Sequence, residues 1–150
     1  LEQAQAALAQ AKADLAAEHD KLLRLAAEFD NYRARTTREK DRIYTDAKAE
    51  VTEKFLPVYD NLARALATET ADEAYKRGVD MTMTGLLEIL SKLNVEVYGA
   101  PGDAFDPAIH NAVMHIEDEA AGENTIVEVF QKGFRLADKV VRFAMVKVAN

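Results

Sequence analysis

Cysteine and tryptophan are absent from this 150-residue sequence, and proline and glycine are scarce, with three and six residues respectively. The lack of cysteine excludes disulfides, thiolate nucleophiles and cysteine-ligated zinc sites, and it fits a reducing compartment. No apolar run approaches the roughly 20 residues that cross a bilayer, and no secretory signal pattern opens the sequence. We therefore expect a cytoplasmic protein that does not enter a membrane.

Sequence patterns of an enzyme are also missing. There is no phosphate-binding glycine loop, no Gly-x-Ser-x-Gly turn and no serine in a recognisable nucleophile context. His110 and His115 lie near acidic residues, but side chains five apart on one strand point to opposite faces, which disfavours joint binding of a metal. We predict that the protein is not an enzyme and has no catalytic residues, no cofactor and no metal site.

The charge balance favours a soluble protein that binds other proteins. Acidic residues outnumber basic ones by 26 to 19, which gives a net charge of −7, whereas affinity for nucleic acid needs clustered positive charge. A basic cluster between Arg33 and Arg42 leaves open the alternative of a coiled-coil DNA-binding protein, beside a structural dimerisation protein. Acidic residues interrupt this cluster, and it follows the strongest heptads instead of preceding them, so we predict no nucleic acid partner.

Residues 1–56 are predicted to form one long helix, because strong helix formers dominate them and they contain neither proline nor glycine. Apolar residues recur every seven positions from Leu1 to Ile43, with a second set between them, which predicts a coiled coil. A small domain cannot bury an apolar stripe about 80 Å long, so we predict a homodimer. The predicted dimer contacts on this helix are Leu8, Leu15, Leu22, Leu25, Phe29, Tyr32 and Ile43.

The middle of this seam is weak, because Thr36 and Glu39 occupy seam positions and the apolar spacing slips by four after Ile43. Two interpretations remain open: the substitutions are simply tolerated there, or the paired helices separate easily on heating.

Residues 57–94 are predicted to form two shorter helices. Pro57 is expected to interrupt the long helix or to begin a new one, and Thr70 with Glu73 forms a capping-box pattern before the next helix. Two such helices in each chain predict a four-helix bundle in the dimer, with close packing at Gly78 and Gly85. The predicted dimer contacts in this region are Leu62, Leu86 and Leu90.

From residue 95 to residue 150 the apolar period changes to two, which predicts a small, mostly antiparallel β-domain. Expected strands include Val95 and Val97 and the segments 113–116, 126–130 and 140–148, with a tight turn over residues 133–139. The predicted fold class is therefore α+β, with the helices and the strands segregated along the chain.

Several segments of the sequence resemble the GrpE family. The resemblance rests on residues 105–113 (FDPAIHNAV), on Gly133-Phe134 and on the region from Asp138 to Val148, with further similarity in residues 29–35 and 56–66. It covers roughly residues 22–149. It implies a parallel homodimer with paired long helices, and a β-domain that contacts the nucleotide-binding domain of a DnaK-type chaperone. The implied activity is nucleotide exchange, in which the chaperone's cleft opens and ADP leaves.

The resemblance also suggests which residues contact the chaperone. Lys139 is expected to pair with a carboxylate of the chaperone, whereas an exposed turn lysine would contribute less than about 1 kcal/mol. The apolar side chains among the candidates could form either a contact face or the core of the β-domain. The full set of predicted chaperone contacts is Lys139, Phe130, Met145, Val148, Pro107, Val113, Asn31, Arg33 and Arg35.

Overall fold

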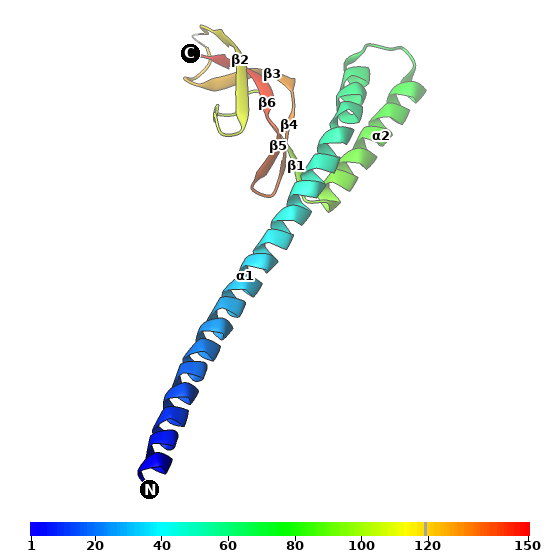
Figure 1. The fold of residues 1–150 in the computed structure, drawn as a ribbon. Helices are drawn as coiled ribbons and strands as arrows, with labels where there is room; N and C mark the ends of the chain where they lie inside the picture. Colours follow the sequence, from blue (N-terminus) through cyan, green and yellow to red (C-terminus); the bar gives the residue numbers. More distant parts are fainter. Residues whose placement is uncertain (119) are drawn as a thin grey trace. The chain divides into compact units, whose positions relative to one another are not determined.

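The computed structural model describes residues 1–118 and 120–150, in which two helices precede six strands (Figure 1). The helices are α1 (Glu2–Ala67) and α2 (Glu73–Lys92). The strands are β1 (Val95–Tyr98), β2 (His110–Ile116), β3 (Thr125–Gln131), β4 (Gly133–Leu136), β5 (Lys139–Arg142) and β6 (Ala144–Ala149). This order confirms the predicted α+β class. The chain divides into two compact units, residues 1–44 and residues 45–150.

The first unit consists of the N-terminal part of α1 and has no core of its own. All its side chains are exposed in the single chain except Thr36, which is half-buried. Leucines of the heptad seam remain open to water, and Leu15, for example, is 71% exposed. The interactions within this segment join neighbouring turns, as between Gln10 and Asp14. The predicted helix is therefore present, and its heptad seam is exposed in the single chain.

Contrary to expectation, α1 does not end at Pro57 but continues to Ala67. A proline within a helix removes one ladder hydrogen bond and crowds the preceding turn. Here, however, Leu56 and Tyr59 are buried on the two sides of Pro57 and hold this part of α1 against the rest of the second unit. Tertiary packing thus overrides the local signal for a break.

The start of α2 also differs from the predicted capping box. Its N-cap is Asp72, whose Oδ1 accepts a hydrogen bond from the backbone N–H of Tyr75 at 3.0 Å. Thr70 instead accepts a hydrogen bond from the backbone N–H of Asp72, at 3.1 Å. A carboxylate at the N-cap satisfies one of the unpaired amide groups of the first turn and complements the helix dipole.

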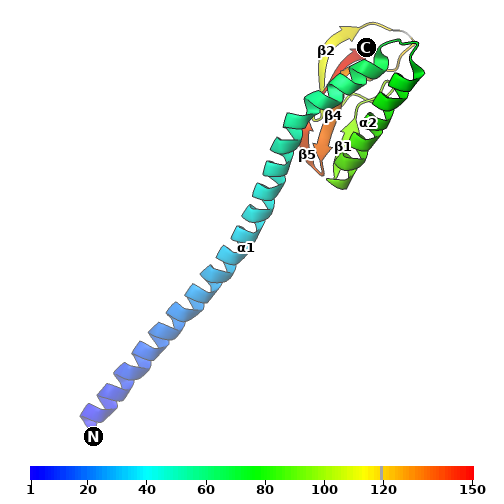
Figure 2. The ribbon, with the colours of Figure 1, turned by 90° about the vertical axis from the view of Figure 1, so that its right-hand side faces the viewer.

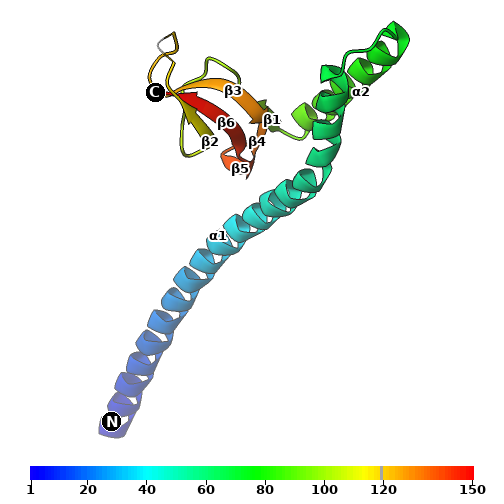
Figure 3. The same ribbon diagram turned by 90° about the horizontal axis from the view of Figure 1, so that it is seen from above.

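The described strands form two three-stranded sheets. Sheet A has the order β1-β4-β5 and is antiparallel, whereas sheet B has the order β2-β6-β3, with β2 parallel and β3 antiparallel to β6. The predicted mostly antiparallel β-domain is confirmed apart from the β2–β6 pairing. Figure 3 shows the three strands of sheet B side by side.

Two local predictions within the β-domain are wrong. The segment expected to be a turn contains β4, in which Phe134 and Leu136 are buried, and the turn itself is limited to Ala137 and Asp138. The strand expected over residues 140–148 is split at Phe143, because β5 belongs to sheet A and β6 to sheet B. A run of β-branched residues shows where strands lie, but it does not show where the chain passes from one sheet to another.

Two hydrophobic cores stabilise the second unit. The first is formed by side chains of α1, α2 and sheet A, whose position beside the two helices is seen in Figure 2. The second lies within the β-domain and is centred on Ile126, Ala144, Val146 and Val148. Sheet A therefore attaches the β-domain to the helices, while sheet B is stabilised by a core of its own.

Candidate functional site

Sheet B has one face turned away from its core, and this face carries the strongest candidates for partner contacts. Along β6, Val146 and Val148 are buried in the core, whereas Met145 and Lys147 occupy the alternate positions and are half-buried. Lys147 pairs with Glu128 of β3, and its Nζ lies 5.5 Å from the centre of the Phe130 ring. We call the side chains on this side the outer face of sheet B; they are Met114, Glu128, Phe130, Met145 and Lys147.

The outer face combines exposed apolar side chains with a pair of charges. Phe130 and Met114 are each about half exposed, and Met114 is paired in register with Lys147 across the β2–β6 ladder. Protein-binding surfaces commonly combine exposed aromatic residues and methionine with charged groups at the periphery. Such a surface can bind a partner that presents apolar groups beside a charged group.

The structure separates the predicted chaperone contacts of the β-domain into different environments. Phe130 and Met145 lie on the outer face of sheet B, and Val113 is the exposed bulged residue of β2. Val148, however, has an exposure of 0% and is paired with the equally buried Ile126, so it lies in the core of the β-domain, which was the alternative to a contact face. Pro107 is exposed in the turn before β2, where Asp106 accepts a hydrogen bond from the amide of Ala108.

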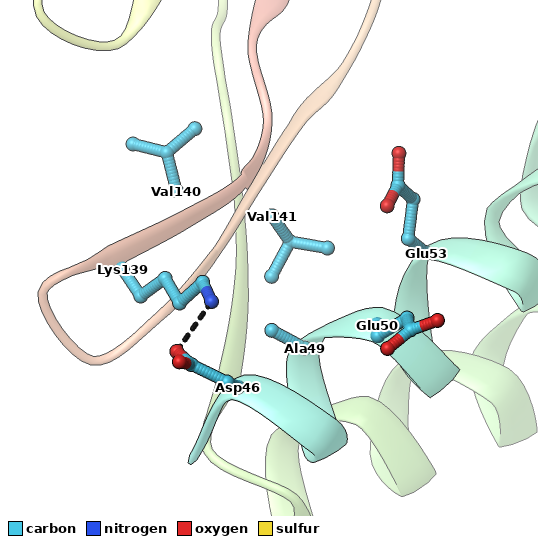
Figure 4. Close-up of a pocket in the computed structure, with 7 residues that line it drawn as sticks. All are labelled: Asp46, Ala49, Glu50, Glu53, Lys139, Val140 and Val141. Atoms are coloured by element: carbon cyan, nitrogen blue, oxygen red, sulfur yellow. Dashed lines mark hydrogen bonds and ion pairs between the residues drawn. The ribbon is translucent and has the colours of Figure 1, made fainter. Parts of the chain in front are cut away.

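Lys139 lies beside α1, at a shallow pocket of about 270 Å³. Its Nζ forms an ion pair with Asp46 Oδ1 at 2.6 Å, and Figure 4 shows the side chain extending from the strand toward α1. The other residues that line the pocket are Ala49, Glu50, Glu53, Val140 and Val141. The Lys139 and Asp46 side chains are both more than 40% exposed, so their pair contributes less than about 1 kcal/mol. A carboxylate of another protein could therefore replace Asp46 at small cost.

A second ion pair, between Asp60 of α1 and Arg142 of β5, is more shielded and was not predicted. The guanidinium binds both carboxylate oxygens, at 2.7 and 2.8 Å, and the two side chains are 24% and 16% exposed. Gln131 donates a further hydrogen bond to Asp60 at 3.1 Å. The hydrogen bond from Arg142 holds the pKa of Asp60 below its ordinary value of 3.8. Both residues lie in segments that resemble the family, but they are 82 positions apart and share no local pattern.

In the first unit, the predicted helix contacts Asn31, Arg33 and Arg35 are exposed, and Arg35 lies 3.8 Å from Glu39. They are thus accessible in the single chain. The seven predicted dimer contacts of the long helix, from Leu8 to Ile43, are exposed as well.

The predicted dimer contacts of the second unit also belong to the core of their own chain, and their contact with a second copy stays a prediction. Leu90 is buried in the core shared by the helices and sheet A, and Leu62 and Leu86 pack against the same core. They stabilise their own chain because the helix faces that they occupy turn toward sheet A. The apolar spacing of the seam continues after Ile43 through Val51 and Phe55, and both side chains are exposed in the single chain. Other exposed apolar residues of these helices had no predicted role in the dimer interface: Val58, Met81, Leu87 and Ile89. The helical period shows that these residues are part of apolar helix faces. It does not show which face packs against sheet A, because that depends on where the sheet lies.

His110 packs inside the β-domain. It is buried, its Nδ1 accepts a hydrogen bond from the backbone N–H of Asp106 at 3.0 Å, and the rings of Tyr98 and Phe105 lie beside it. Among the described residues, no three histidine or acidic side chains gather as metal ligands would, and no helix is long and apolar enough to cross a membrane.

Comparison with known proteins gives consistent matches. The GrpE family model matches residues 1–150. Protein GrpE of Clostridium beijerinckii is 53% identical over 131 residues, which cover 87% of this chain and 63% of that protein. Protein GrpE of Clostridium acetobutylicum is 54% identical over 137 residues, covering 91% and 68%, and that of Oceanobacillus iheyensis is 42% identical over 132 residues, covering 87% and 70%. The chain thus spans about two thirds of the length of these relatives.

Proposed function

This chain belongs to the GrpE family, and we propose that it is a cytoplasmic co-chaperone that accelerates the release of ADP from a DnaK-type chaperone. It binds the nucleotide-binding domain of that chaperone and acts in protein folding and the heat-shock response. It catalyses no chemical step itself. Its effect arises because it binds the open nucleotide cleft more tightly than the closed one, which shifts the chaperone toward the open state.

The observation that carries this proposal is the outer face of sheet B. Phe130, Met114 and Met145 offer apolar surface, and Lys147 with Glu128 offers charge, on a sheet whose opposite side is a tightly packed core. A rigid sheet presents such side chains without a large loss of conformational entropy on binding. We propose that this face and Lys139 contact the nucleotide-binding domain, with Val113 and Pro107 at its margin.

The helices supply the second part of the proposal, which is a parallel homodimer. Residues 1–56 pair along the exposed heptad seam, residues 57–94 contribute to a four-helix bundle, and residues 95–150 bind the chaperone. The exposed apolar residues of both helices support this arrangement, because leaving so many large apolar side chains in water is unfavourable. Asn31, Arg33 and Arg35 are proposed to form additional contacts with the chaperone.

The size of the effect follows from linkage. A 1,000-fold weakening of ADP binding requires that the protein prefer the open state by about 4 kcal/mol. The coupling is reciprocal, so bound ADP must weaken the affinity of the chaperone for this protein by the same factor. ATP then fills the empty cleft.

The direct test measures the release of a fluorescent ADP analogue from a purified DnaK-type chaperone, with and without this protein. We expect a large acceleration that saturates with protein concentration. A release rate that does not change at any concentration would refute the proposal.

The role of Lys139 is tested in the same assay. Lys139→Glu should weaken binding about tenfold, because it replaces attraction to a chaperone carboxylate by repulsion, and it should leave the dimer intact in sedimentation analysis. Lys76→Glu makes the same charge change at an exposed position of α2 and serves as the control. Equal affinities for the two variants would remove Lys139 from the binding surface.

A further inference from the structure

The Asp60–Arg142 pair belongs to a larger cluster that joins α1 to the β-domain. Besides its two bonds to Asp60, the guanidinium donates hydrogen bonds from Nε and Nη2 to the carbonyl oxygen of Lys132, at 3.2 and 2.9 Å. Gln131, the neighbour of Lys132 in the chain, binds the same carboxylate. We call this cluster of Asp60, Gln131, Lys132 and Arg142 the α1–β5 clamp. Through these bonds, Asp60 of α1 is linked to Gln131 at the end of β3 and to Arg142 of β5, and Arg142 is linked in turn to Lys132.

The surroundings of Arg142 restrict the clamp to one geometry. The guanidinium carbon lies 5.2 Å from the centre of the Phe134 ring, and Tyr59 of α1 meets that ring edge-on at 5.0 Å. A planar guanidinium that is bidentate on a carboxylate fixes both the direction and the rotation of its partner. The apolar contacts of the same core are non-directional, so on their own they permit small rotations of the sheet over the helix.

We propose that the α1–β5 clamp is a positioning device for nucleotide exchange, with Asp60 and Arg142 as positioning residues that contact neither the nucleotide nor the chaperone. The clamp fixes the orientation of the β-domain on α1, so that the β-domain binds the open cleft tightly and the closed cleft weakly. This inference rests on the proposed function above.

The proposal follows from the requirement for differential affinity. A β-domain in a fixed orientation cannot follow a lobe of the chaperone as its cleft closes, so contacts made in the open state are lost or strained in the closed state. A β-domain that rotates freely follows the lobe and binds both states similarly. Such a protein still binds, but it shifts the equilibrium little, because equal affinity for two states shifts nothing.

The first experiment measures the orientation itself, without the chaperone. Because the sequence has no cysteine, spin labels can be placed at Lys54→Cys on α1 and Asn111→Cys on β2, with a reference pair at Asn111→Cys and Asp138→Cys within the β-domain. Labelled chains are diluted with unlabelled ones to suppress distances between copies. Asp60→Asn and Arg142→Gln should broaden the distance distribution between α1 and β2 and leave the reference distribution unchanged. Unchanged widths for both pairs would overturn the proposal.

The second experiment separates binding from exchange with a DnaK-type chaperone loaded with fluorescent ADP. For the Asp60→Asn and Arg142→Gln variants we expect the maximal acceleration at saturation to fall about tenfold, while Kd for the ADP-bound chaperone changes less than about threefold. If the clamp supplies the preference for the open state, Kd for the nucleotide-free chaperone should rise, because linkage ties the ratio of the two Kd values to the weakening of ADP binding. Full acceleration at saturation, or an equal rise of both Kd values, would overturn the proposal.

Matched variants distinguish the clamp from general stability. Arg135→Gln removes an arginine of sheet A whose partner, Glu96, lies in the same sheet, so it should retain full acceleration. Arg142→Lys keeps the charge without the bidentate geometry, so it should show the same reduced acceleration of ADP release that is expected of Arg142→Gln. It therefore replaces Arg142→Gln as the test if Arg142→Gln does not fold. If Arg142→Lys behaves like the unmodified protein, the clamp is not a positioning device. If the unmodified protein itself fails to accelerate ADP release, the proposed function fails, and the spin-label distances still test the clamp.

Discussion

Substituting alanine for Gly133 tests the packing of the β-domain most directly. Gly133 begins β4 and is paired with Tyr98 of β1 in the antiparallel ladder of sheet A. A Cβ atom at this glycine would lie 2.3 Å from Cζ and 2.4 Å from Cε2 of the Tyr98 ring. Carbon atoms in favourable contact are about 3.5–4.0 Å apart, so the ring must move by more than about 1 Å.

The cost of that movement can be worked out from the contacts of the ring. The single proton of the Tyr98 hydroxyl is shared between the carbonyl oxygens of Ile109 and Arg142, at 2.7 and 3.0 Å, and a shift of this size breaks this shared hydrogen bond. Overpacking costs about 1–3 kcal/mol, and a lost hydrogen bond adds about 1 kcal/mol. We expect Gly133→Ala to lower the free energy of unfolding by about 3 kcal/mol, a large part of the stability of a typical domain.

The assay is urea unfolding of the single variant and of Gly133→Ala in a Tyr98→Ala background. Removing the ring removes the clash, so alanine at position 133 should then cost less than about 0.5 kcal/mol. This coupling isolates the contact between the two residues from any effect of alanine on the backbone. An unchanged stability of Gly133→Ala, or an equal cost in both backgrounds, would refute the reasoning.

Three further predictions concern the helices and the clamp. The pKa of Asp60 is lowered in the folded state, so the contribution of this carboxylate to stability is complete above its ordinary pKa of 3.8 and disappears as the pH falls through the lowered value. Unfolding measured at a series of pH values should therefore show that the difference in free energy of unfolding between the protein and Asp60→Asn shrinks in acid. Gly78→Ala should stabilise α2 by about 0.5–1 kcal/mol in urea titrations, because among the described residues no atom beyond the adjacent residues and the helix's own backbone lies within 4 Å of the added methyl group. On heating, the first unit should lose helical dichroism before the second, since Thr36 and Glu39 weaken the middle of its seam; one transition for the whole protein would contradict this.

The features that the sequence predicted well are those with a local or periodic signal. The heptad repeat predicted the long helix because every seventh residue lies on the same helix face, which requires no knowledge of the remaining structure. The strands around Val95 and Ile126 were predicted from β-branched residues bounded by turns. The class of the fold followed from the order of these signals.

The features that failed depend on contacts between distant segments. Leu90 was assigned to a dimer interface from the helical spacing of its segment and the expected four-helix bundle, and only the position of sheet A shows that its side chain packs in the core of its own chain. Pro57 suggested a break because its local cost is evident in the sequence, whereas the compensating burial of Leu56 and Tyr59 is not. Gly133 was predicted to form a turn, but its role depends on Tyr98, 35 residues away.

Within the second unit, the arrangement of the two sheets explains how a small β-domain can be stable and still offer a binding surface. Sheet A uses its buried residues and Arg142 to attach to the helices, so sheet B needs no contact with them to stay folded. The alternation along β6 then assigns Val146 and Val148 to stability, and leaves Met145 and Lys147 available for a partner. Because the two roles fall on alternate residues of one strand, substitutions at neighbouring positions can change the stability and the partner affinity independently.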